Sequence, residues 1–378
     1  MVREMDFVDE CYADKDLSLL KKLTLVIPTY NRNYYLSRCL WYHAHFPFGQ
    51  IIVADSSPEE KKVVNRETVS KIRELFVVDI LYLEYEPETE KYGGDIYQKW
   101  GDAVMHVETE YSQICTDKEF LVPSSMLQSI ELLDSNQEYS VSDGDHIHIE
   151  ALSDTEYTYS IIPSFSSNSN SSAERLREIS KNPGCTLLAL HRTKTLKKIY
   201  QSLFDNNISD IRFGEIYLEL LDVIHGKTYK INNVHTYRDT LKFSESDVIK
   251  MKQESSAFRY PQLWEYPEPI YQEKYQRFLQ GIISQLSQTN RADLHDKNLE
   301  TILEEYIQKR MGKSHPLRNI SMIKSLFYKL PRNIQKTVLR MFLNDSCGIS
   351  DFSERKKTIE LNSEMTITKL MKFNEIPW

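Results

Sequence analysis

Residues 23–32, Leu-Thr-Leu-Val-Ile-Pro-Thr-Tyr-Asn-Arg, decide the fold of this chain. The first five residues form a short, mostly apolar run, and Pro28 has no backbone N–H with which to continue a strand ladder. A short apolar run that stops at a proline and polar residues is typical of a buried strand that enters a loop. We therefore predict a strand over 23–27 and a polar loop at its carboxyl end.

The same pattern recurs further along the chain. A second apolar run, Gln-Ile-Ile-Val-Ala at 50–54, ends in Asp-Ser-Ser-Pro at 55–58. Two more strands are predicted over 78–84 and 111–115. Helical patterns lie between the strands, at 33–46, about 59–75, from the Tyr92–Asp95 turn to about 108, and from Pro123 onward. Strands that alternate with helices at this spacing predict an α/β fold with a mostly parallel, doubly wound sheet.

The pattern changes from residue 139. Two short β segments flank Ser-Asp-Gly-Asp at 142–145, which predicts a hairpin. The Ser- and Asn-rich stretch 163–172 predicts a polar, mobile loop. The remaining elements of this part are predicted as strands over 185–190 and 228–238 and as helices over 193–204 and 213–225.

Strand signals fade past about residue 245, and helical patterns follow at 268–287 and 297–311. We expect three parts: an N-terminal extension (1–21), an α/β catalytic domain (22–245) and an all-α C-terminal region (246–378).

Residues 306–344 contain nine Lys and Arg residues and no Asp or Glu. Basic residues alternate there with apolar ones. Most surface helices pack such an apolar side on their own protein and turn the charges to water, and we favour this interpretation. The alternative is a peripheral contact with an anionic membrane.

Composition narrows the class of protein. The net charge of −8 argues against a nucleic-acid partner, because general nucleic-acid binders are more often basic. The N-terminus lacks an apolar signal core, so we expect a cytoplasmic protein, at most peripheral at the inner membrane face. The five cysteines are scattered without a CxxC pair, and we expect free thiols.

Polar clusters follow four of the predicted strands, at 28–32, 55–57, 91–95 and 116–119. In open α/β sheets, ligands bind beyond the carboxyl ends of the strands. The four clusters together therefore predict one ligand site.

Asp117 and Glu119 are two carboxylates separated by one residue, directly after a predicted strand. Hard oxygen ligands so placed can hold Mg²⁺ or Mn²⁺ against a diphosphate and neutralise the charge that builds on it. His235 is a further candidate ligand. The tripeptide alone also fits a solvated acidic turn whose charge Lys118 offsets.

Glu215 lies at the start of a predicted helix that ends at His225-Gly226. A carboxylate there can accept the proton of an acceptor hydroxyl. The alternative is an acid that complements the helix dipole. No GxSxG, P-loop or HExxH motif is present, and Gly93-Gly94 is not a dinucleotide fingerprint.

Residues 25–32, Leu-Val-Ile-Pro-Thr-Tyr-Asn-Arg, resemble the opening strand and loop of family 2-like glycosyltransferases of the GT-A fold. Residues 53–57 resemble the second strand of that family. Residues 115–120 stand where it has an Asp-x-Asp metal motif. Glu215, eleven residues before Gly226, has the spacing of its catalytic base.

The resemblance covers about residues 22–240, and 191–193 and 237–239 resemble strand ends of a bacterial subgroup. Two residues depart from the family pattern. Lys118 interrupts the acidic triplet, and Gly214 replaces the usual first acid before Glu215.

The resemblance implies an inverting transferase that uses a nucleotide-sugar donor. The acceptor would be a hydroxyl of a glycan, a lipid-linked sugar or a polymer, in cell-surface polysaccharide or glycoconjugate synthesis. We expect the loop 163–172 to lie near this acceptor, and a homo-oligomer is compatible with the resemblance. The residues expected at the donor are Pro28, Thr29, Tyr30, Asn31, Arg32, Asp55, Lys91, Lys99 and Asp117. The expected base is Glu215, and Mg²⁺ or Mn²⁺ is expected at Asp117, Glu119 and His235.

Two rival functions remain. A non-catalytic sugar- or polymer-binding module would have lost metal binding, and Lys118 keeps this alternative open. A nucleotidyltransferase is disfavoured, because it should carry a Gly-rich basic loop directly after the first strand, where residues 28–32 contain no glycine.

Overall fold

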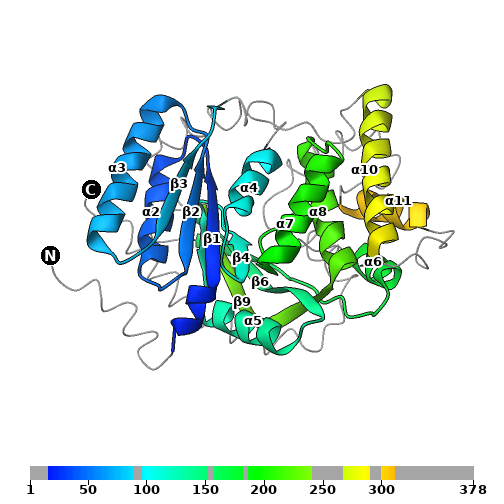
Figure 1. Ribbon diagram of the computed structural model, residues 1–378, viewed down its shortest axis with the longest axis horizontal. Helices are drawn as coiled ribbons and strands as arrows, with labels where there is room; N and C mark the ends of the chain where they lie inside the picture. Colours follow the sequence, from blue (N-terminus) through cyan, green and yellow to red (C-terminus); the bar gives the residue numbers. More distant parts are fainter. Residues whose placement is uncertain are drawn as a thin grey trace, which may run out of the picture. The chain divides into compact units, whose positions relative to one another are not determined.

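The computed structural model describes residues 16–87, 96–151, 157–181, 186–240, 267–289 and 299–310. These residues all fall within one compact unit, Met1–Met311. They form an α/β fold around a nine-stranded sheet (Figure 1).

The first half of the sheet is parallel, as predicted. Its strands are β1 (Leu23–Thr29), β2 (Gln50–Asp55), β3 (Ile80–Glu84) and β4 (Tyr111–Ile114), in the spatial order β3-β2-β1-β4. Every residue of β1 is buried, because β1 lies between β2 and β4. A strand covered on both faces reads as a continuous apolar run, which is why the sequence pattern identified it.

Helices connect these strands. They are α2 (Asn33–Ala44), α3 (Glu59–Leu75) and α4 (Ile96–Met105), preceded by the 3₁₀ turn η1 (Ser18–Lys22). Figure 1 shows α2 and α3 on one side of the strands and α4 on the other. The sheet is therefore covered on both faces in this half, as a doubly wound fold requires.

β1 extends two residues past its predicted end and includes Pro28. Pro28 pairs with Ala54 of β2, whereas the pairing of β1 with β4 stops at Val26. On the β4 side, Pro28 therefore has no partner strand that would need its missing N–H, and it is tolerated as in an edge strand.

The second half of the sheet is mixed. Its strands are β5 (Glu119–Leu121), β6 (Tyr139–Ala151), β7 (Tyr157–Ile162), β8 (Leu190–Arg192) and β9 (Lys227–Thr240). They continue the sheet in the order β4-β8-β6-β9-β5, and β7 pairs with β6. β6 and β9 are parallel, whereas the other pairings of this half are antiparallel.

The predicted hairpin at 142–145 is wrong. These residues lie inside the single strand β6, where register irregularities against β9 interrupt the alternation. Gly144 serves a close approach and not a turn, because a Cβ there would lie 2.4 Å from the Asn233 carbonyl oxygen. The predicted strand 185–190 is also wrong: residues 186–189 form a turn, and β8 begins only at Leu190.

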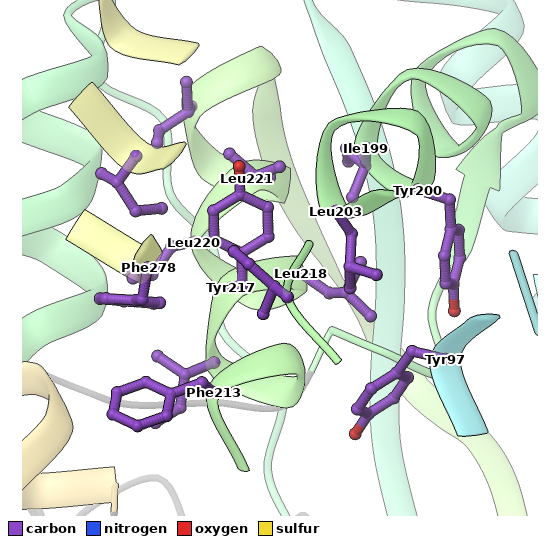
Figure 2. Packing of buried hydrophobic residues seen from close by; sticks show 14 of the residues in the cluster. Tyr97, Ile199, Tyr200, Leu203, Phe213, Tyr217, Leu218, Leu220, Leu221 and Phe278 are labelled. Atoms are coloured by element: carbon purple, nitrogen blue, oxygen red, sulfur yellow. The ribbon is translucent and has the colours of Figure 1, made fainter. Parts of the chain in front are cut away.

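The remaining helices are α5 (Pro123–Ser135), α6 (Ser172–Lys181), α7 (Thr193–Asp205), α8 (Ile211–His225), α10 (Glu268–Thr289) and α11 (Leu299–Arg310). Helix α8 is central, because α6, α7 and α10 all pack on it, while α11 packs on α6. In Figure 2, Phe213 and Tyr217 of α8 face Phe278 of α10. The two predicted C-terminal helices are thus confirmed up to residue 310, and the domain boundary at 245 stays a prediction.

The Ser- and Asn-rich segment 163–172 has defined contacts. Ser167 forms a β-bridge with Thr228, and Glu178 accepts hydrogen bonds from Ser167 and Ser169. Arg175 donates to the carbonyl of Ser169 at 2.8 Å. The segment is thus tied to α6 and β9, and its mobility and its place near the acceptor stay predictions.

Candidate active site

Three loops meet at the carboxyl ends of β1, β2 and β4. Thr29 pairs with Asp55, so these two strand ends lie side by side, and Cys115 donates its N–H to Val26 at 2.9 Å, which sets the end of β4 beside them. We call residues 29–32, 55–57 and 116–119, together with Lys99, the strand-end cluster. The sequence predicted the convergence of four such clusters from the rule for open α/β sheets, and three of them meet here, whereas the fourth, at 91–95, lies outside the described residues.

Asp117 joins the first loop to the third. Its carboxylate is buried and accepts a hydrogen bond from the Thr29 hydroxyl at 2.8 Å. Arg32 donates to the other carboxylate oxygen at 3.3 Å. A buried carboxylate needs such partners, so these contacts hold the two loops together.

Asn31 joins the first loop to the second. Its backbone N–H donates to the Ser57 hydroxyl at 2.8 Å, and its φ of 55° lies in the left-handed region. Asparagine tolerates this conformation better than most residues.

Lys99 of α4 contacts the loops that follow β1 and β2. The buried ammonium donates to the Thr29 carbonyl at 3.2 Å and to the Ser56 hydroxyl at 2.8 Å. Lys99 therefore ties the ends of β1 and β2 together.

Asp55 is fully buried, and both its oxygens accept hydrogen bonds. The Ser57 N–H reaches one oxygen at 2.7 Å, and the Asn65 amide at 2.7 Å and the Tyr82 hydroxyl reach the other. Burial, and then the bond to Asp55, raise the pKa of Tyr82. In this structure Asp55 shapes the turn that carries Ser57 and does not itself face solvent.

Thr116–Glu119 form a tight turn. The Glu119 N–H donates to the Thr116 carbonyl at 2.9 Å, and the Thr116 N–H donates back to one oxygen of the Glu119 carboxylate. The other oxygen, Oε1, has no hydrogen-bond donor and lies 3.8 Å from Arg238 Nε. The Lys118 ammonium lies over the Tyr35 ring, 4.6 Å from its centre.

His235 has other partners than Asp117 and Glu119. It is fully buried, 3.0 Å from the Gln113 amide and 3.6 Å from Asp143. Burial lowers its pKa to about 4.

His146 is the histidine that interacts electrostatically with Glu119. It lies 3.1 Å from both oxygens of Asp143. Burial disfavours its charged form, but Asp143, Glu119 and Asp145 outweigh burial and raise the pKa of His146. No local pattern in the sequence identifies His146, because only long-range strand pairing brings it near Glu119.

A second buried pair lies on β8 and α8. His191 is 3.0 Å from Asp222, which also accepts a hydrogen bond from Thr186 at 2.5 Å. Burial opposes protonation of His191, but Asp222 raises its pKa. His191 thus has protein partners for its ring. For a further histidine, His225, burial is the main cause that lowers the pKa to about 4.

Glu215 differs from the other acids at α8 by its exposure. Asp210 caps the helix through the N–H groups of Arg212 and Phe213, and Glu219 is fully buried and accepts from the Tyr306 hydroxyl at 2.7 Å. The side chain of Glu215 is 21% exposed and lies 3.7 Å from Arg212. Of the acids at α8, Glu215 is therefore the one that a substrate can reach.

The predicted metal ligands do not converge as a set. Both oxygens of Asp117 and one of Glu119 accept protein hydrogen bonds, and His235 faces Gln113 and Asp143. These residues as placed do not fit Mg²⁺ or Mn²⁺, which need several free oxygen ligands.

One group in the described part of the chain has three ligand-type atoms within 4.8 Å of one another: Cys39, His43 and Cys115. The His43 ring nitrogens already contact the Cys39 carbonyl at 2.8 Å and the Leu121 N–H at 3.3 Å. Thiols are soft ligands and do not suit Mg²⁺ or Mn²⁺. Cys39 and Cys115 are free thiols, as predicted.

The structure brings together Thr29, Asn31, Arg32, Lys99 and Asp117 in direct contacts. Pro28 and Tyr30 belong to the same strand and loop, and Lys91 lies outside the described residues.

No family model and no curated protein sequence matches this chain. Among solved structures, S. aureus TarS is similar over 78% of this chain and 44% of its own, with 13% identity and a TM-score of 0.47. TarS 1–349 in complex with UDP-GlcNAc is similar over 78% and 93%, with 12% identity and a TM-score of 0.41. A mannosyltransferase from Pyrobaculum calidifontis, in complex with GDP-Man and Mn²⁺, is similar over 86% and 85%, with 12% identity and a TM-score of 0.37.

This chain thus spans less than half the length of full TarS. Similarities of this size do not establish a function, so the function has to be argued from the site.

Proposed function

We propose that this chain is an inverting glycosyltransferase that moves a sugar from a nucleotide-sugar donor to an acceptor hydroxyl. The observation that carries the proposal is the strand-end cluster. Three loops that resemble the donor-binding segments of GT-A glycosyltransferases are bonded to one another through Thr29–Asp117 and Asn31–Ser57. The acceptor class is a glycan, a lipid-linked sugar or a polymer, in cell-surface polysaccharide or glycoconjugate synthesis.

The donor would lie across the ends of β1 and β2. Residues 28–32 would surround the nucleotide, since their backbone is fixed by the contacts of Asn31 and Lys99. Asp55 would act by holding the Ser57 turn in place. A rigid loop loses little entropy when a ligand binds, which favours affinity.

Glu215 would be the general base. The acceptor oxygen attacks the anomeric carbon from the side opposite the phosphate, and the carbon–oxygen bond to the diphosphate breaks. The electron pair of that bond stays on the diphosphate, and the hydroxyl proton moves to the Glu215 carboxylate. The configuration at the anomeric carbon is inverted.

The metal at Asp117, Glu119 and His235 stays a prediction. Because the placed side chains do not fit it, no step above depends on a metal.

A membrane role for residues 306–344 is also a proposal, as are the cytoplasmic location and a homo-oligomer. Tyr306 and Ile307, in α11, are buried in the core, and the rest of the stretch beyond residue 310 lies outside the described part. None of the described helices is long and apolar enough to cross a bilayer.

A transfer assay tests the proposal. The protein is incubated with UDP-, GDP-, CMP- and dTDP-sugars and a set of glycan and lipid-linked acceptors. We expect release of one nucleotide and an acceptor that is heavier by one sugar, with the opposite anomeric configuration by NMR. Donor binding without transfer to any acceptor would instead support the sugar-binding module, and retained configuration would contradict the inverting mechanism.

A further inference from the structure

We propose that Arg32 and Arg238 supply the positive charge that neutralises the diphosphate leaving group, in place of a metal ion. The inference rests on the proposed function and concerns the same site. Its starting point is the Thr116–Glu119 turn, where a metal is expected by resemblance and where each acid instead has an arginine beside it.

The two acids are already used by the protein. Asp117 accepts from Thr29 and Arg32, and Glu119 accepts from the Thr116 N–H. Both carboxylates are buried, with 1% of each residue exposed. A metal ion would have to displace at least two of these donors, and the donors would then lose their partners at a cost.

Each of the two arginines is held by one acid of the Thr116–Glu119 turn. Arg32 Nη1 lies 3.3 Å from Asp117, and Arg238 Nε lies 3.8 Å from Glu119, its direct partner in the β5–β9 ladder. The α-carbons of residues two positions apart lie within about 7 Å of each other. The acidic turn thus fixes two guanidinium groups in one small region of the strand-end cluster.

Both arginine side chains keep a large surface for a ligand. Arg32 is 42% exposed and Arg238 is 39% exposed, although their carboxylate partners are buried. A guanidinium has five N–H donors in a planar fork, a geometry that suits the oxygens of phosphate groups. Helix α2 begins at Asn33, directly after Arg32, and its dipole adds to the positive potential.

The two lysines of the cluster are placed for other roles. The Lys99 ammonium is buried against Thr29 and Ser56, and the Lys118 ammonium lies over the Tyr35 ring. Arg32 and Arg238, each paired with an acid of the turn, are by contrast 42% and 39% exposed.

The chemical role follows from the charge that develops. When the bond between the anomeric carbon and the diphosphate oxygen breaks, that oxygen takes the electron pair and gains negative charge. Preorganised N–H donors aimed at this oxygen stabilise the transition state more than the ground state. Arg32 and Arg238 would supply such donors without needing a metal.

Calorimetric titration with UDP and GDP tests the inference. We expect the affinity of the nucleotide that binds to be the same in excess EDTA and in Mn²⁺. Arg32→Met and Arg238→Met should each weaken it about tenfold to a hundredfold, the loss of a charge-assisted hydrogen bond. The matched control is Arg277→Met on α10, since Arg277 is 46% exposed and also forms an ion pair, with Glu273.

Each single variant leaves a buried acid without its arginine, which lowers the stability of the folded state. The paired variants Arg32→Met with Asp117→Asn and Arg238→Met with Glu119→Gln remove both charges and should still lose affinity. Binding that requires Mn²⁺ or Mg²⁺, or arginine variants with wild-type affinity in EDTA, would overturn the arginine role and leave the proposed function intact. If UDP, GDP and the CMP and dTDP species all fail to bind under every condition, both the arginine role and the proposed function are overturned.

Discussion

The two halves of the sheet are built from contacts of different range. In the parallel half, paired strands are separated in the chain by one to three helices, as β1 is from β2 by one and from β4 by three. In the mixed half, Glu119 pairs with Arg238, which lies 119 positions later in the chain. The interior also differs. The charged residues of the parallel strands, Asp55 and Glu84, are the last residues of β2 and β3, whereas the mixed half buries Asp143, His146 and His235 in its middle.

The difference indicates a division of roles. The loops at the ends of β1 and β2 are joined by hydrogen bonds, which suits the binding of a donor. The mixed half and α8 carry the buried pairs of acids and histidines and the partly exposed Glu215, which suits the handling of a proton. Donor binding and proton transfer should therefore respond to different substitutions.

The largest effect is expected for Glu215→Gln. Glutamine keeps the shape but cannot take a proton, so turnover should fall about 10²- to 10⁴-fold. Donor affinity should stay unchanged, because Glu215 lies on α8 and the hydrogen bonds Thr29–Asp117, Asn31–Ser57 and Arg32–Asp117 that hold the donor loops remain in the variant. Turnover and donor binding by calorimetry are the two measurements. Glu174→Gln, in the first turn of α6, is the matched control.

Near-normal turnover in Glu215→Gln would remove the base assignment. A loss of donor affinity as large as the loss of turnover would show that α8 belongs to the donor site, and the two halves would then share both roles.

The second effect is the pH dependence of stability. His235 stays neutral in the folded protein down to about pH 4, whereas an unfolded histidine takes up a proton near pH 6.5. The unfolded state therefore binds more protons between these values, and His235 makes stability fall as the pH drops from about 6.5 to about 4. His146 and His191 act in the opposite sense, since their raised pKa values stabilise the fold below about 6.5 and this contribution is lost as the pH rises through them.

His235→Gln should remove its part of the slope, about 1.4 kcal/mol per pH unit in that window. Urea unfolding at pH 7.5, 6 and 5 measures it. The groups that face His235, namely Asp143, His146, His191 and Gln113, remain in the variant. An unchanged difference in unfolding free energy between pH 7.5 and pH 5 would mean that His235 is protonated in the folded state.

The same contrast explains which parts of the fold the sequence could predict. Strands β1 and β2 and the polar groups at their ends follow from local apolar runs and from the rule for strand ends. The continuous strand β6 could not be read locally, because Ser142–Asp145 have turn composition and only pairing with β9 keeps them extended. Likewise, the partnership of Glu119 with Arg238 and His146 depends on strand pairing, and no spacing in the sequence reports it.

The smallest effect concerns Asn31 in the parallel half. A β-branched residue at a φ of 55° is strained, so Asn31→Val should lower the free energy of unfolding by about 1–2 kcal/mol. Asn31→Gly should be close to wild type, because glycine adopts this conformation readily. Denaturant titration compares the two. Equal loss in both variants would show that the Asn31 side chain matters more than its backbone conformation.

The most direct test of the central claim is a thermal-shift comparison of wild type and Asp117→Asn with UDP, GDP, CMP and dTDP species. We predict that one of these nucleotides raises the melting temperature of the wild type, since a ligand at a hundred times its Kd stabilises a folded protein by about 2.7 kcal/mol. Asp117→Asn, measured against its own ligand-free melting temperature, should lose that shift, because Thr29 and Arg32 lose their shared carboxylate. A wild type that responds to none of these nucleotides, or a variant that keeps the full shift, would contradict a donor site at the strand-end cluster.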